Sequence, residues 1–192
     1  MTALIIGFIL LYTDITVQVT EITAIGLFPD FIGWFLIYRG LSELSHMSPK
    51  FARVKTVSLI AGFLAIIAWL LDVFGVTKFF GVFSLPLLGA LCAAGLVVTY
   101  RIIEGVDDIE IDTNADLKAK EMYKIFPPLC VAEAIGLLVG VFGMVMLFYA
   151  FKIALLVCLV IFIVFFVQAK KGYDALPEEV KKKKEEKPDE NE

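Results

Sequence analysis

Apolar residues gather along this chain in long runs, and charged residues gather in the connections between the runs. Several runs approach or exceed about 18 residues, the length that indicates a membrane-spanning helix. Apolar and polar positions do not alternate within them, so strands of an outer-membrane barrel are not expected. The pattern predicts six helical spans, at residues 3–19, 22–38, 57–76, 79–100, 125–147 and 150–167.

Composition agrees with this reading, because 59% of the 192 residues are hydrophobic and only 20% are charged. Backbone groups in lipid must find their hydrogen-bond partners within the protein, and a helix provides them. We therefore expect an all-α fold, a polytopic transmembrane bundle over residues 1–169. Residues 170–192 are too polar to bury a core and are predicted to form a disordered, charged tail.

The basic residues predict how the chain threads the membrane. Fifteen of the 17 Lys and Arg residues fall in the segments 39–55 and 101–124 and in the tail, whereas only Lys78 and Lys152 fall in the other connections. Cytoplasmic loops are enriched in Lys and Arg. The bias predicts three helical hairpins with both termini in the cytoplasm. Because the N-terminus lacks the basic region and the cleavage site of a signal peptide, we interpret it as the first span.

Two local details refine the connections. The fifth and sixth spans form one apolar stretch, and Lys152, flanked by aromatic residues, marks the expected turn between them. In the acidic segment 104–121, Thr113 to Asp116 reads as a capping box. It predicts a short interfacial helix over residues 114–127, with Leu117, Met122 and Phe126 near the lipid headgroups.

Ionisable residues inside the spans are the candidates for a binding site, because a charge in hydrocarbon is costly. Asp14 precedes the first outer turn by about seven residues and Asp30 follows it by about nine, so a rise of ~1.5 Å per residue brings them to similar depths. Two close carboxylates could share a proton or hold a cation. Glu133, inside the fifth span, is a further candidate for a proton or cation site.

Pro29 stands beside Asp30 in the predicted second span and has two interpretations. In the first, Pro29 breaks the helix inside the membrane, loosened further by Gly26 and Gly33, and exposes backbone groups that bind an ion or solute, as in carriers. In the second, a helix simply starts near Phe28, with Pro29 and Asp30 in its first turn, where the helix dipole favours an acid. The sequence alone leaves both interpretations open.

The residues give no sign of an enzyme. There is no HExxH, GxSxG, P-loop or Gly-rich dinucleotide motif. The three cysteines lie apart in apolar runs, and no Cys and His cluster has the spacing of a zinc site. We therefore expect no catalytic residues, no cofactor, no bound metal and no nucleic-acid partner.

One segment resembles a group of membrane proteins. In Leu27 to Ser45, the sequence LFPDFIGWFLIYRGLSELS places Pro-Asp-Phe-Ile-Gly at positions 29–33 and Gly-Leu at positions 40–41, after an early span containing Asp14. This resembles uncharacterised multi-pass membrane proteins of Gram-positive bacteria, clostridia especially. The likeness covers about the first quarter of the chain and implies a bacterial membrane location.

Two functional hypotheses follow. In the first, a protein of the bacterial cytoplasmic membrane binds or moves a cation, a proton or a small solute through Asp14, Asp30 and Glu133. In the second, it is a non-transporting scaffold, sensor or regulator that acts through its cytoplasmic loop and tail. Membrane lipids, a second copy of the chain or another membrane protein are the expected partners.

Overall fold

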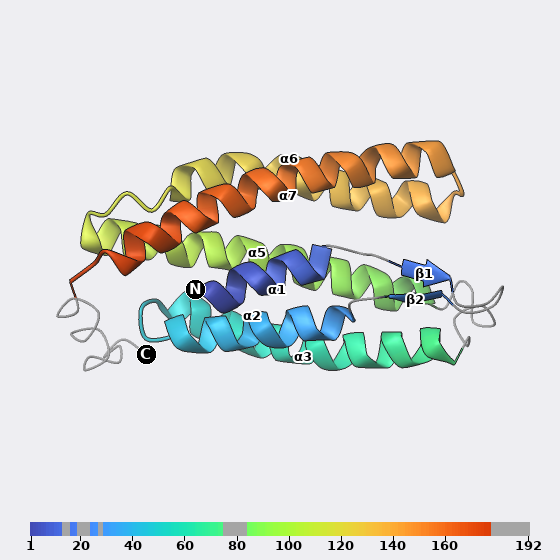
Figure 1. The fold of residues 1–192 in the computed structure, drawn as a ribbon, viewed down its shortest axis with the longest axis horizontal. Coiled ribbons are helices and arrows are strands. Elements are labelled where there is room, and N and C mark those ends of the chain that lie inside the picture. Colours follow the sequence, from blue (N-terminus) through green and yellow to red (C-terminus); the bar gives the residue numbers. More distant parts are fainter. Residues whose placement is uncertain (13–15, 19–23, 27–28, 75–83, 178–192) are drawn as a thin grey trace. The chain divides into compact units, whose positions relative to one another are not determined.

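The computed structural model is helical, with one small β-hairpin near the N-terminus (Figure 1). The residues that it describes are 1–12, 16–18, 24–26, 29–74 and 84–177. The chain divides into two compact units, and each unit is built from two separate stretches of the sequence. The first unit contains Met1–Ser42 and Val54–Val98, and the second contains Glu43–Arg53 and Thr99–Glu192.

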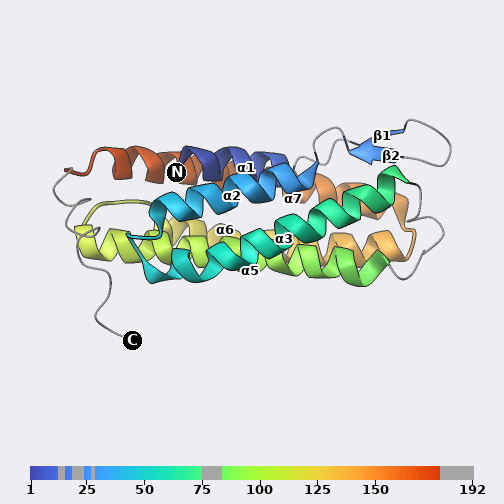
Figure 2. The same cartoon turned by 90° about the horizontal axis from the view of Figure 1, so that it is seen from below.

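The first unit begins with two short antiparallel helices joined through the β-hairpin (Figure 2). In the hairpin, Thr16 of β1 pairs with Gly26 of β2, and Gln18 pairs with Ala24. The elements that contribute to this unit are α1 (Thr2–Tyr12), β1 (Thr16–Gln18), β2 (Ala24–Gly26), α2 (Asp30–Leu44), α3 (Pro49–Val73) and the beginning of α5 (Ser84–Thr113).

Glycine allows α1 and α2 to approach backbone to backbone. A Cβ atom added to Gly40 would lie 2.9 Å from the backbone nitrogen of Leu4, and one added to Gly7 would lie 2.8 Å from the carbonyl oxygen of Gly33. Side chains at these positions would push the helices apart. Leu4 and Ile37 are completely buried at this interface.

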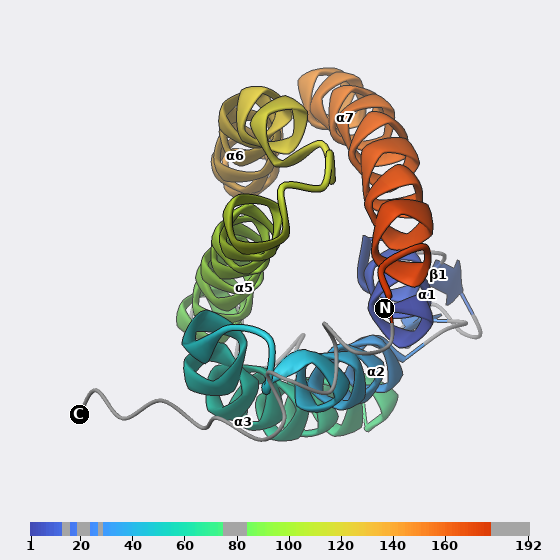
Figure 3. The ribbon, with the colours of Figure 1, turned by 90° about the vertical axis from the view of Figure 1, so that its left-hand side faces the viewer.

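Aromatic contacts fix the level of α2 along α3, the neighbouring helix in Figure 3. The ring centroids of Phe35 and Phe63 are 5.9 Å apart. Those of Phe31 and Trp69 are 5.8 Å apart, so the start of α2 lies level with Trp69. Trp69 precedes the last residue of α3, Val73, by four positions, or about 6 Å. The N-terminal turn of α2 therefore lies near one end of α3, not halfway along it.

The second unit contains a long antiparallel helical hairpin, α6 (Ala119–Val141) and α7 (Val145–Asp174), together with the end of α5 and the α2–α3 connection (Figure 1). Small residues on α6 face aromatic residues on α7: a Cβ atom on Gly136 would lie 3.5 Å from Cβ of Phe151, and one on Gly140 would lie 3.1 Å from the ring of Phe148. The completely buried side chains of this unit include those of Ile102, Val106, Leu117, Met122, Leu129 and Phe162.

The turn between α6 and α7 lies at Gly143, so the expectation that it lies at Lys152 was wrong. Gly143 has φ +68°, a left-handed conformation that glycine adopts without steric cost. Its N–H donates to the carbonyl of Gly140, and the N–H of Met144 donates to that of Val139. This is the Schellman pattern that closes helices. Lys152 lies inside α7. The position of the turn is set by the left-handed conformation and hydrogen bonds at Gly143, whereas the prediction relied on the charge of Lys152.

Among the described residues, four helices are long and apolar enough to cross a membrane. They correspond to the predicted third to sixth spans, shifted in their bounds, and are consistent with a helical membrane bundle. Their length and composition alone mark them as candidate membrane spans. The four helical segments are Pro49–Val73, Pro86–Thr113, Ala119–Val141 and Val145–Asp174.

The first two predicted spans were wrong as continuous helices. Residues 3–19 divide into α1, which ends at Tyr12, and β1, whereas residues 22–38 divide into β2 and α2. The stretch from Asp14 to Thr23 is rich in Thr, Val and Ile, and β-branched residues favour strands over helices. The predicted spans were based on the number of apolar residues alone. That number does not distinguish β-branched residues, which favour strands, from residues that favour helices.

The expected interfacial helix over residues 114–127 was also misplaced. α5 continues to Thr113, and Asn114 has φ +51°, so the capping-box residues end one helix and do not begin the next. α6 begins at Ala119. Leu117 and Met122 are completely buried inside the second unit, which removes them from the headgroups.

Candidate functional site

Asp30 occupies the first turn of α2 and is exposed, with Pro29 immediately before the helix. The N–H of Ile32 donates to the carbonyl of Pro29 at 3.0 Å, which closes this first turn. A carboxylate at a helix N-terminus is favoured by the helix dipole. The helix start, the second interpretation of Pro29 and Asp30, agrees with this geometry. A break inside a helix does not, because Gly26 lies in β2 and Gly33 in the interior of α2.

Asp14 lies outside the described residues. Its pairing with Asp30 therefore stays a prediction. The level of Asp30, one residue before Phe31 and hence near Trp69, places the carboxylate close to the end of α3. If the first unit crosses a membrane, Asp30 lies near an interface, where water reaches it and a carboxylate costs little.

Glu133 lies inside the apolar part of α6. Eight residues separate it from Ile125 and eight from the last helical residue, Val141, so about 12 Å of apolar helix extends on each side. Because α6 ends at Val141 and not at residue 147, Glu133 lies at the middle of this apolar segment. Its side chain is half-buried, and within the described part of the chain it makes no ion pair or hydrogen bond.

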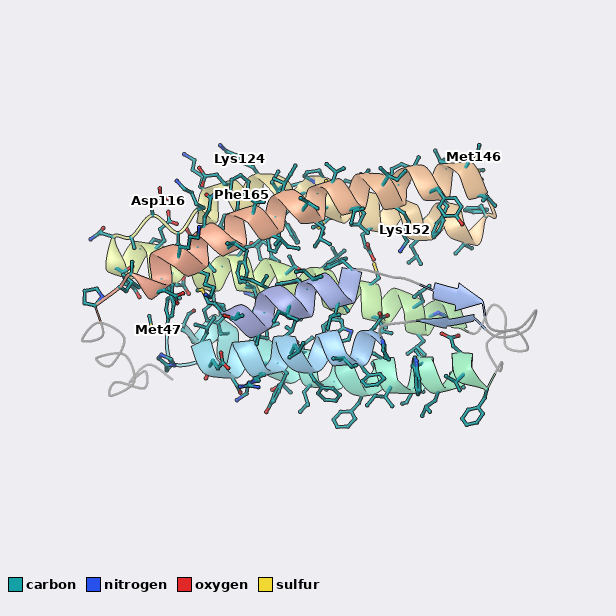
Figure 4. All side chains as sticks on the ribbon, viewed as in Figure 1. Met47, Asp116, Lys124, Met146, Lys152 and Phe165 are labelled. Carbon is teal, nitrogen blue, oxygen red and sulfur yellow. The ribbon has the colours of Figure 1, made fainter. Side chains whose placement is uncertain are left out.

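Lys152 was predicted to mark a turn but lies inside α7. It follows the first residue of α7, Val145, by seven positions, or about 10 Å (Figure 4). Its ammonium lies 5.7 Å from the ring centroid of Phe148. The contacts of Gly136 with Phe151 and of Gly140 with Phe148 set the register of the hairpin. In this register the levels of Lys152 and Glu133 differ by about three residues, or roughly 4 Å.

A second cluster of polar groups joins the start of α3 to α5. The Ser48 hydroxyl donates a hydrogen bond of 2.6 Å to one oxygen of Asp108, and the Lys50 ammonium donates one of 2.8 Å to the other. Ser48 is only 2% exposed and also accepts a hydrogen bond from the Lys50 backbone N–H. Ser48 therefore caps α3 while Asp108 holds the cap in place.

Glu110 organises the connection between α5 and α6. One oxygen of its carboxylate accepts the backbone N–H groups of Leu117 and Ala119, at 2.9 Å and 3.1 Å. These bonds satisfy amide groups at the start of α6, where a helix leaves donors without partners. Nearby, the exposed Lys118 ammonium donates a hydrogen bond to Asp116, which lowers the pKa of Asp116 and raises that of Lys118.

These features define a class of protein: a helical membrane protein with ionisable side chains in its α6–α7 hairpin and hydrogen-bonded polar ends. Comparisons of the chain with protein-family models, with curated proteins and with solved structures give no match. Its function has to be argued from its own residues.

Proposed function

We propose that the chain is an integral protein of the cytoplasmic membrane that binds or moves a proton, a cation or a small solute at Glu133. α1 and α2 form the first hairpin, and the four long helices form the other two. This threading keeps both termini and the Lys- and Arg-rich connections in the cytoplasm, as the distribution of basic residues favours.

The position of Glu133 carries the proposal. A carboxylate with about 12 Å of apolar helix on either side lies near the middle of a bilayer core of about 30 Å. Such residues are rare in membrane helices and mark ion and proton pathways. Lys152 lies at a level that differs from that of Glu133 by roughly 4 Å along the helices, but it makes no ion pair with Glu133.

Reconstituted protein tests the proposal through ion flux. Wild type, Glu133→Gln and the matched control Glu121→Gln, in the first turn of α6, are placed in vesicles that contain a fluorescent dye selective for the ion under test. Protons, Na⁺ and K⁺ are tested in turn under an imposed gradient. We expect wild type and Glu121→Gln to transport one of these ions. The transport rate of Glu133→Gln should be at least tenfold lower than that of wild type. Thermal unfolding is used to show that all three proteins are folded. Equal ion-transport rates in the three folded proteins would refute a role for Glu133.

A second candidate function is regulation or assembly through the cytoplasmic end. The hydrogen bonds of Asp108 and Glu110 support it, because they fold the polar ends of α3, α5 and α6 into a defined surface. Cross-linking in native membranes would test it. A partner that is captured by wild type and Glu133→Gln but not by Asp108→Ala would favour this function over ion binding.

A further inference from the structure

One exposed stripe of α6 combines lysine, proline and apolar side chains. Apart from the adjacent Pro127 and Pro128, its residues recur every three or four positions, so they share one face of the helix. Val131 and Leu138 are 54% and 58% exposed in the apolar part of the stripe. The exposed residues along the stripe, in chain order, are Lys120, Lys124, Pro127, Pro128, Val131, Ile135 and Leu138.

Lys120 and Lys124 carry the charge of this stripe. They are one helical turn apart, or about 6 Å. Within the described residues, neither makes an ion pair. By contrast, Lys50, Arg101 and Lys118 are paired with Asp108, Glu104 and Asp116. Figure 4 shows Lys124 projecting away from the α6–α7 pair. The two ammonium groups are therefore available to an anion from outside the protein.

The two prolines supply acceptors beside these donors. Proline has no N–H, so Pro127 and Pro128 cannot donate to the carbonyl groups of Tyr123 and Lys124, four residues earlier. Two neighbouring backbone carbonyls of α6 consequently lack their usual helical partner, on the same turn as Lys124. A ligand that combines an anion with hydrogen-bond donors would satisfy both kinds of group.

Aromatic rings indicate the depth of this arrangement. The ring centroid of Tyr100 lies 6.2 Å from that of Tyr123 and 5.4 Å from that of Phe126. Tyrosine gathers where a membrane helix meets the headgroups. Lys120 lies on the polar side of these rings and Lys124 lies at their level, whereas Val131, Ile135 and Leu138 lie on the apolar side.

We propose that this face of α6 binds an anionic phospholipid of the leaflet that borders the Lys- and Arg-rich ends. Its phosphate contacts Lys120 and Lys124, its headgroup hydroxyls donate to the carbonyls of Tyr123 and Lys124, and an acyl chain covers Val131 and Leu138. The proposal requires α6 to cross a membrane but is independent of ion binding at Glu133, so Glu133→Gln keeps the lipid.

Lipid titration of the detergent-purified full chain, followed by native mass spectrometry, tests the site. The probes are phosphatidylglycerol, phosphatidylcholine and inorganic phosphate. A basic residue at a membrane surface contributes about fivefold in affinity, so Lys120→Gln/Lys124→Gln should bind phosphatidylglycerol about 25-fold more weakly. The control Arg53→Gln/Lys171→Gln removes two exposed charges elsewhere and should change the affinity less than threefold, and Lys120→Arg/Lys124→Arg should retain binding.

Equal weakening in both Gln pairs would overturn the proposal, because attraction would then be diffuse. Binding of phosphatidylcholine as tight as that of phosphatidylglycerol, or displacement of the lipid by millimolar inorganic phosphate, would also overturn it. The carbonyl contacts are tested with phosphatidylmethanol, which has the same charge and no headgroup hydroxyl. We expect wild type to prefer phosphatidylglycerol and Pro127→Ala/Pro128→Ala to lose that preference; a preference that survives would remove the carbonyls from the site.

Discussion

Gly33 of α2 and Gly7 of α1 face each other with no room for a side chain on either. A Cβ atom on Gly33 would lie 2.9 Å from the carbonyl oxygen of Gly7, and the reciprocal distance is 2.8 Å. Both obstacles are backbone atoms, which cannot turn aside as a flexible side chain can. The role of Gly33 in the structure is therefore close helix packing.

Gly33→Ala should destabilise the protein by about 1–3 kcal/mol, because overpacking forces the two helices apart. Thermal unfolding in detergent, followed by the fluorescence of the buried Trp34, measures the effect. The matched control is Gly89→Ala in α5, where an added Cβ has no neighbour within 4 Å. There alanine should raise stability by up to about 1 kcal/mol, since it favours the helix. A Gly33→Ala protein as stable as wild type would contradict the close contact.

Asp108→Ala should cost about 1–3 kcal/mol in the free energy of unfolding. The reason is the buried Ser48 hydroxyl, which would lose its acceptor. The Lys50 ion pair contributes less, because its side chains are 31% and 28% exposed. Asp108→Asn keeps one acceptor and should lose less stability than Asp108→Ala.

Asp116→Ala is the control for Asp108, since Asp116 pairs with Lys118 in an exposed position. Denaturant unfolding should show a change within about 0.5 kcal/mol. If Asp108→Ala and Asp116→Ala have the same effect, the capping of α3 does not depend on Asp108.

Glu110→Ala should loosen the start of α6, whereas Glu110→Gln should loosen it much less. Glutamine retains a carbonyl oxygen that can accept from the backbone, but alanine leaves the amides of Leu117 and Ala119 without their partner. Hydrogen exchange at these two amides measures the effect directly, and we expect faster exchange in Glu110→Ala. The same exchange rates in the Ala and Gln variants would show that the carboxylate does not cap the helix.

The sequence predicted the third to sixth spans because length and apolarity alone determine which helices can cross a bilayer. It did not predict how helices end. The ends depend on local hydrogen bonds, such as those of Glu110 and Gly143, and these are invisible to a count of apolar residues. The connections were consequently predicted as loops with one short interfacial helix over residues 114–127, although α5 continues as a helix to Thr113.

The role of Glu133 stays a prediction, and its basis is likewise length and apolarity. Glu133 was identified as a candidate because a carboxylate inside an apolar run can be found from the sequence without knowledge of the fold. Lys152 was missed because the apolar stretch was divided at its charge, whereas the conformation of Gly143 divides it nine residues earlier. Gly143 was a usable signal, since glycine commonly follows the last residue of a helix.

Gly143→Val should destabilise the α6–α7 hairpin by about 1–2 kcal/mol, the cost of a left-handed conformation for a residue with a Cβ atom. Gly143→Asn should lose less, because asparagine tolerates this conformation better. Gly136→Ala is the control: its Cβ would meet Phe151 at 3.5 Å, an ordinary contact. Thermal unfolding that ranks Gly136→Ala below Gly143→Val in stability would place the turn elsewhere.

The position of the turn also predicts which residues of α7 meet water. Met146, 87% exposed and one residue past the start of α7, should lie at the membrane surface, whereas Lys152 lies about 9 Å deeper along the helix. Cys92, Cys130 and Cys158 form no disulfide with one another and are first replaced by serine or alanine. In intact cells, a membrane-impermeant maleimide should then label Met146→Cys rapidly and Lys152→Cys at least tenfold more slowly. Faster labelling of Lys152→Cys would contradict a turn at Gly143 and would place residue 152 at the membrane surface.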